Sequence, residues 1–144
     1  MGDDGIGINA IRKLKKFNLP DNISLIEGAT FGLDLLYFLE NKTHAIFIDA
    51  IDLNKTPGEL IIVEKEEIFN YYSMKFSPHE IGINDLLFAA DLINVLPENF
   101  ILIGLQPYII ELSLNLSDLI KKNMKVLINE ILKILKNWGI NLDA

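Results

Sequence analysis

Two short apolar runs, each followed by a polar residue, most constrain the fold of this chain. Residues 45–48 read Ala-Ile-Phe-Ile and stop at Asp49, and residues 100–105 stop at Gln106. Continuous apolar runs of this length are typical of strands that are covered on both faces in a parallel sheet. Because ligands of such sheets bind beyond the carboxyl ends of the strands, Asp49 and Gln106 occupy positions expected of functional residues.

Helical segments alternate with these strands. The expected order is helix 6–17, strand 24–27, helix 33–39 capped by Thr30, strand 45–48, strand 60–63, helix 84–95, strand 100–105 and a last helix that opens at Ser117 and stops at Gly139. The alternation predicts an α/β protein: a three-layer sandwich with a mostly parallel, twisted sheet, phosphorylase/hydrolase-like or flavodoxin-like. At 144 residues, the chain is expected to form a single domain over residues 1–144.

Composition argues against several classes of function. Thirteen Lys and Arg against twenty Asp and Glu give a net charge of −7, which disfavours a nucleic-acid partner. The absence of cysteine excludes thiolate catalysis and cysteine metal sites, and nothing indicates a disulfide framework. An acidic N-terminus is unlike a signal peptide, and lysines interrupt the apolar last helix, so no membrane span is expected. We therefore expect a cytoplasmic protein without a nucleic-acid or membrane partner.

Two carboxylates and a histidine supply the donors for a candidate metal site. Asp49 ends a buried strand, where a carboxylate needs water, a charged partner or a cation. Asp4 precedes the first helix, and His79 follows Ser77-Pro78 at a loop-to-helix junction. Each has an ordinary interpretation: a hydrated strand end, a helix N-terminal carboxylate, and a lone histidine without a chemical role. Together they suit a divalent transition metal with open coordination positions.

Motifs of other catalytic classes are missing from the sequence. There is no G-x-S-x-G elbow, no H-E-x-x-H helix and no Walker phosphate loop. Gly5-Ile6-Gly7 is too short to be a dinucleotide fingerprint.

Five motifs resemble, in order and approximate spacing, those of the nickel-iron hydrogenase maturation proteases. They are residues 2–7 (GDDGIG), 27–32 (EGATFG) followed by Leu35-Leu36, 48–50 (IDA), 77–79 (SPH) and 104–107 (GLQP). The resemblance extends from Met1 to the last helix. It implies an endopeptidase that removes the C-terminal extension of a hydrogenase large-subunit precursor after nickel insertion.

The same resemblance implies a role for each candidate residue. Asp4, Asp49 and His79 match the family's metal ligands, and they would recognise nickel already bound in the precursor; zinc or cadmium could occupy the site in vitro. Asp85 matches a further acidic position and could support the site, or it could be a solvated helix residue. A Lewis-acid metal and a carboxylate general base, as in an aspartyl protease, both fit this set.

The chain departs from the family at its beginning. Members open with an apolar strand and a Gly-x-Gly-Asn loop, whereas this sequence starts in the link that follows. We therefore expect the first strand to be missing and Met1 to be an internal methionine of a longer natural product. Two alternatives stay open: a non-catalytic flavodoxin-like module that binds a metal or an anion, and an inactive truncated paralogue. The sequence leaves the oligomeric state open, with a monomer favoured.

Overall fold

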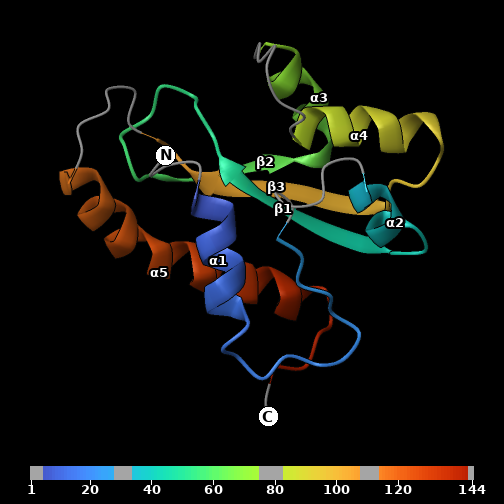
Figure 1. Cartoon of the computed structure of the whole chain (residues 1–144), viewed down its shortest axis with the longest axis horizontal. Helices are drawn as coiled ribbons and strands as arrows, with labels where there is room; N and C mark the ends of the chain where they lie inside the picture. The colour runs from blue at the N-terminus through green and yellow to red at the C-terminus, as the bar shows by residue number, and fades with distance from the viewer. Residues whose placement is uncertain (1–4, 28–33, 75–82, 108–113, 143–144) are drawn as a thin grey trace. The chain divides into compact units, whose positions relative to one another are not determined.

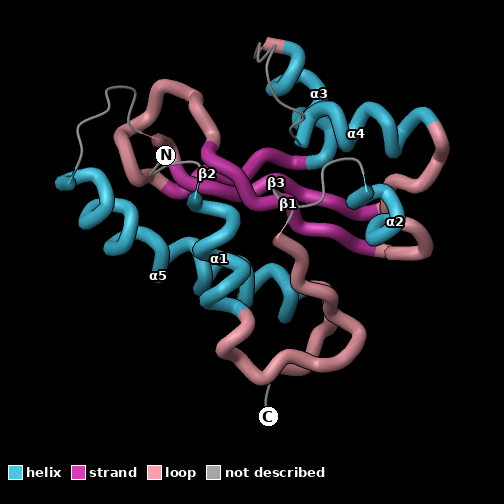
Figure 2. Tube along the Cα trace, viewed as in Figure 1, coloured by secondary structure: helices cyan, strands magenta, loops and turns pink. Residues whose placement is uncertain are grey.

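The computed structural model describes residues 5–27, 34–74, 83–107 and 114–142, with side chains described except at 114–120. Its elements, shown in Figure 1 and coloured by type in Figure 2, are α1 (Ile6–Leu14), α2 (Leu35–Leu39), β1 (His44–Ala50), β2 (Leu60–Glu64), α3 (Lys65–Ser73), α4 (Ile83–Leu92), β3 (Asn99–Leu105) and α5 (Leu114–Asn137). Helices and strands therefore mix along the chain, and the predicted α/β class is confirmed.

The three strands form one sheet in the order β1-β3-β2. β1 and β3 run parallel, because backbone hydrogen bonds join both pairs of ends. The N–H of Asn99 donates to the carbonyl of Thr43 where the two strands start, and the N–H of Ile51 donates to the carbonyl of Leu105 where they end. The two apolar runs found in the sequence are thus parallel strands, as predicted, and the structure shows that they are neighbours in the sheet.

β2 runs antiparallel to β3. The N–H of Gln106, just after β3, donates to the carbonyl of Glu59, just before β2, and the carbonyl of Gln106 accepts from Gly58. Gly58 has a φ of 87°, a value that glycine adopts without steric cost, and it turns the chain into β2 beside the end of β3. The sheet is therefore mixed, whereas the sequence predicted a mostly parallel one.

Two compact units divide the chain by residue. Unit 1 comprises Met1–Glu27, Ile48–Ile61 and Ile103–Ala144, and unit 2 comprises Gly28–Phe47 and Ile62–Leu102.

The core of unit 1 is built on α1 and α5, which pack against each other (Figure 1). α1 buries Ile6, Ala10 and Leu14, four residues apart and therefore on one face of the helix. The buried side chains of α5 recur at the same kind of spacing: Met124, Leu127, Ile128, Ile131, Ile134 and Leu135. Each large apolar side chain buried in this way stabilises the fold by about 1.5–3 kcal/mol.

The core of unit 2 includes a pair of buried aromatic rings. The rings of Phe47 on β1 and Phe100 on β3 meet edge to face with centroids 6.2 Å apart. α2 packs against α4, and at the surface the half-exposed ring of Phe88 on α4 lies 5.0 Å from that of Phe69 on α3. These contacts link α2 and α3 to α4 within unit 2.

The ends of two helices follow a Schellman pattern. After α5, Gly139 has a φ of 91°, its N–H donates to Lys136, and the N–H of Ile140 donates to Leu135. The predicted stop at Gly139 is confirmed. After α4, Asn94 has a φ of 59° in the equivalent position, so this helix ends at Leu92 and not at residue 95.

Several other predicted boundaries differ from the structure. α1 ends at Leu14 and not at residue 17, and α5 begins at Leu114, so Ser117 is not its N-cap. Residues 24–27 are not a strand. α2 begins at Leu35, and its predicted cap, Thr30, lies outside the described residues.

Candidate active site

Asp49 lies near the carboxyl end of β1, as the sequence predicted, but the strand continues one residue further, to Ala50. Its side chain is half-buried, and its Oδ1 accepts a hydrogen bond of 2.9 Å from the N–H of Ala50. The orientation of this carboxylate is therefore coupled to the peptide plane between Asp49 and Ala50.

Gly104 on β3 lies against the backbone of Asp49. A Cβ added at position 104 would lie 1.7 Å from the carbonyl oxygen of Asp49 and 3.1 Å from Cγ1 of Ile51. Real Cβ atoms do not approach backbone oxygen so closely, so any side chain at 104 would push β1 and β3 apart. Glycine at this position lets β3 approach the strand that carries Asp49.

Gly7, in the motif at residues 2–7, makes a similarly close approach to the backbone of β1. It lies in the first turn of α1, and a Cβ there would lie 2.7 Å from the carbonyl oxygen of Ile48. The start of α1 therefore rests on β1 at the residue before Asp49. Gly7 follows Asp4 by three positions in the sequence.

Gln106, the second polar residue that ends an apolar run, is 1% exposed, and no other polar or charged residue is buried in the part of the chain that the structure describes. Its Oε1 accepts from the N–H of Leu53 at 2.8 Å and of Lys55 at 3.0 Å. Its Nε2 donates to Oδ1 of Asp52 at 2.9 Å and to the carbonyl of Pro107 at 3.2 Å. The sequence indicated this residue by position alone, without predicting these contacts.

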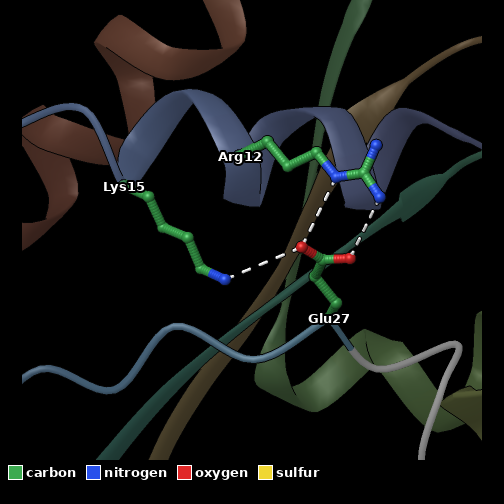
Figure 3. Close-up of polar contacts among 3 residues, drawn as sticks. All are labelled: Arg12, Lys15 and Glu27. Carbon is green, nitrogen blue, oxygen red and sulfur yellow. Dashed lines mark hydrogen bonds and ion pairs between the residues drawn. The ribbon is translucent and has the colours of Figure 1, made fainter.

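Glu27, the first residue of the motif at residues 27–32, makes ion pairs with residues of α1 and its C-terminal end. Figure 3 shows its carboxylate between two basic side chains, Arg12 on α1 and Lys15 directly after it. Oε1 lies 3.5 Å from a guanidinium nitrogen of Arg12, and Oε2 lies 3.6 Å from Nζ of Lys15. Both basic side chains are more than half exposed, so these ion pairs are weak individually and act as a tether.

The other two predicted ligands, Asp4 and His79, lie outside the described residues. Within the ranges that are described, no group of three or more His, Asp or Glu residues could hold a metal ion. The set of Asp4, Asp49 and His79 therefore stays a prediction. Asp85, the possible supporting residue, lies in the first turn of α4.

A membrane span was not expected from the sequence. Among the helices in the described ranges, none combines the length and the apolar character needed to cross a bilayer.

These features define an α/β protein with a carboxylate at the shared end of two parallel strands, where two glycines approach the backbone of the strand that carries it. The model of the hydrogenase maturation protease family matches residues 8–134. The chain belongs to the hydrogenase maturation protease family, and it is a peptidase that acts in hydrogenase maturation.

Two similar proteins bear names that refer to hydrogenase formation or maturation. The chain is 31% identical to the hydrogenase expression/formation protein HupD of Bradyrhizobium diazoefficiens over 98% of its own length and 75% of that protein. It is 29% identical to the hydrogenase 2 maturation protease of Escherichia coli, with 96% of this chain and 85% of that protein covered.

A solved structure agrees with the fold. The hydrogenase maturating endopeptidase HybD of E. coli superposes with a TM-score of 0.82 at 28% identity, covering 96% of this chain and 87% of that one. The family resemblance inferred from the five sequence motifs is thus confirmed.

Proposed function

We propose that this peptidase removes the C-terminal extension of a nickel-iron hydrogenase large-subunit precursor, and that it recognises nickel already inserted there. In this proposal Asp4, Asp49 and His79 complete the coordination of the precursor's nickel ion. The ion is part of the substrate, so it reports that the precursor is ready to be cut.

The donor set supports this proposal. Two carboxylates and one imidazole leave coordination positions open for ligands from the precursor. Zinc or cadmium, which accept similar donors, would occupy the same site in vitro. Asp49 contributes a half-buried carboxylate at the end of β1, where α/β proteins commonly bind ligands.

The observation that carries the proposal is the approach of Gly7 to Ile48. It brings the helix that follows Asp4 onto β1 beside Asp49. Two motifs that are far apart in the sequence thus converge on one strand end, as a shared metal site requires. The approach of Gly104 to Asp49 adds the end of β3 to the same region.

Hydrolysis needs a base for the attacking water and an acid for the leaving nitrogen. A carboxylate near the metal can take the proton of the water as its oxygen attacks the scissile carbonyl carbon, and the proton can then pass to the departing amine. Alternatively, the precursor's nickel ion, held by Asp4, Asp49 and His79, would supply Lewis-acid polarisation of the carbonyl or the water. In both schemes no covalent acyl-enzyme forms, in keeping with the absence of cysteine.

We further propose that the protein acts in the cytoplasm and adopts a three-layer arrangement of helices around its sheet. Without cysteine the chain has no disulfide framework of the kind typical of secreted proteins, which supports the first statement. The alternation of helices and strands supports the second.

The decisive experiment incubates the protein with nickel-loaded precursor and, in parallel, with nickel-free precursor, and follows the precursor mass. Loss of the C-terminal segment is expected only from the loaded form. Equal cleavage of both forms would contradict nickel recognition. Cleavage of neither would contradict the endopeptidase activity and favour an inactive paralogue.

A further inference from the structure

Gln106 contacts most of the loop that follows β1, the strand that carries Asp49. This loop, residues 51–59, connects β1 to β2 and is called the β1–β2 loop here. Gln106 contacts it through its backbone at Gly58 and Glu59, and through its side chain at three further positions: Asp52, Leu53 and Lys55.

The side chain of Gln106 uses its full hydrogen-bonding capacity. An amide has two N–H donors and an oxygen with two lone pairs, and here each has a partner. A buried amide that lost any of these partners would leave a polar group unsatisfied, at a cost of about 1–3 kcal/mol. The contacts therefore favour a single conformation of the β1–β2 loop.

The loop is continuous with Asp49. Its first residue, Ile51, is bonded to Leu105 at the end of β3, and the N–H of Ala50 donates to the Asp49 carboxylate. A change in the loop's path would rotate the peptide that carries this N–H, and the carboxylate would turn with it.

We propose that Gln106 is a positioning residue for the peptidase reaction: by fixing the β1–β2 loop, it holds the Asp49 carboxylate in its working orientation. The inference rests on the proposed role of Asp49 in the active site. Gln106 itself touches neither metal nor precursor in this scheme, and it acts through the loop.

A charge exchange between two side chains tests the proposal. In Gln106→Glu, both amide donors are lost and a second carboxylate faces Asp52. In Asp52→Asn, the amide oxygen of the new side chain still accepts from Gln106. In the double variant, the carboxylate at 106 accepts from Leu53, from Lys55 and from the new amide at 52, so the link to residue 52 is restored with donor and acceptor reversed, whereas the donation to the carbonyl of Pro107 is lost.

The readout is kcat and KM for cleavage of nickel-loaded precursor, measured well below the unfolding temperature of each variant. Gln106→Glu is expected to lower kcat at least about 10-fold while KM changes less than about threefold, because a misplaced catalytic group slows the reaction step. Asp52→Asn should stay within about threefold of the unaltered protein, and the double variant should recover kcat at least about threefold over Gln106→Glu, but not fully, because the donation to Pro107 is not restored. Asn129→Asp, which adds the same charge on the exposed face of α5, should leave both constants unchanged.

A spectroscopic signature accompanies the kinetics. Gln106 is the single glutamine of the chain, so glutamine-selective ¹⁵N labelling gives one pair of side-chain amide signals. Slow exchange of these protons with water is expected in the unaltered protein and in Asp52→Asn. Rapid exchange would mean that the amide is not held in the loop, and it would overturn the proposal.

The remaining outcomes are equally decisive. Normal kcat in a folded Gln106→Glu variant, a rise in KM without a fall in kcat, or a double variant no better than Gln106→Glu would each overturn the proposal.

If neither variant with glutamate at 106 folds, Asp52→Ala replaces them; its kcat should fall severalfold, and an unchanged kcat would overturn the proposal. Asp49→Asn tests the role of Asp49 separately from that of Gln106. Normal cleavage by this variant would refute the role of Asp49 itself, whatever the result at Gln106.

Discussion

The α-carbon of Gly104 faces the carbonyl oxygen of Asp49 so closely that a Cβ would lie 1.7 Å from it. The two residues belong to parallel neighbours, β3 and β1, and Asp49 is the one candidate ligand among the described residues. The close contact between the strands is thus located at the proposed site, and glycine is required there for its lack of a side chain.

Gly104→Ala is expected to destabilise the protein by about 3 kcal/mol or more, at the upper end of the cost of overpacking. The reason is that the added methyl group meets backbone and not a movable side chain. Urea unfolding measures the effect. Gly139→Ala is the matched control, since nothing lies within 4 Å of its Cβ position; its positive φ alone should cost about 1 kcal/mol. An equal decrease in the free energy of unfolding of the two variants would contradict the steric explanation at position 104.

Gly7→Ala should also destabilise the protein, although alanine favours helices. The helix propensity gained is about 1 kcal/mol, and a Cβ 2.7 Å from the carbonyl of Ile48 should cost about 1–3 kcal/mol, so we expect a net loss of about 1 kcal/mol. Asn9→Ala, at an exposed position of the same helix, gains propensity without a clash and should stabilise slightly. The two free energies of unfolding are compared by urea titration; a gain in both variants would show that α1 does not press on β1.

Asp49→Asn should lower the cleavage of nickel-loaded precursor by at least about 100-fold, since an amide is a poor metal ligand and a poor base. His79→Ala should abolish processing in the same way while the fold is retained. Asp91→Asn, on the exposed face of α4, serves as the control for charge and should cleave normally. Precursor length is followed by mass spectrometry, and the far-UV circular dichroism of each variant checks its fold. Normal processing by either site variant would remove that residue from the proposed site.

Glu27→Gln should cost only about 0.5 kcal/mol at low salt, since its partners Arg12 and Lys15 are largely exposed. The difference should shrink further at 1 M salt, where the Debye length falls to about 3 Å. Thermal unfolding at two salt concentrations measures both quantities. A large loss of stability in Glu27→Gln that persists at high salt would show that Glu27 is a structural residue of unit 1 and not a surface ion-pair partner.

The strands were predictable because buried strands consist of consecutive apolar residues, which are visible in the sequence. The apolar runs at 45–48, 60–63 and 100–105 are all strands, extended by a residue or two at their ends. The direction of β2 was not predictable, since an apolar run reads the same in either direction. The turn at Gly58 and its bond to Gln106 set that direction, and both depend on the folded structure.

Helix α3 was missed although its sequence carries a signal. Ile68, Tyr71 and Tyr72 are buried at helical spacing, but the helix opens with Lys65, Glu66 and Glu67, which dilute the apolar pattern. The opposite error occurred at 24–27, where an apolar pair suggested a strand. In the structure this segment is tied to α1 through Glu27.

Of the candidate site, the sequence located Asp49 from its position after an apolar run. It could not reveal which atoms require glycine at 7 and 104, because those contacts join residues distant in the chain. The same holds for Gln106: its motif was visible, but its hydrogen bonds reach residues about 50 positions away.

The tryptophan at the end of α5 and the paired tyrosines of α3 lie in different units. Trp138, the only tryptophan, precedes the stop at Gly139 and belongs to unit 1. The paired rings of Tyr71 and Tyr72, 4.8 Å apart on α3, belong to unit 2. Fluorescence excited selectively in the indole therefore follows the melting of one unit, while tyrosine absorbance is weighted toward the other. Coincident curves would identify a single cooperative transition, and separated midpoints would reveal which unit gives way first.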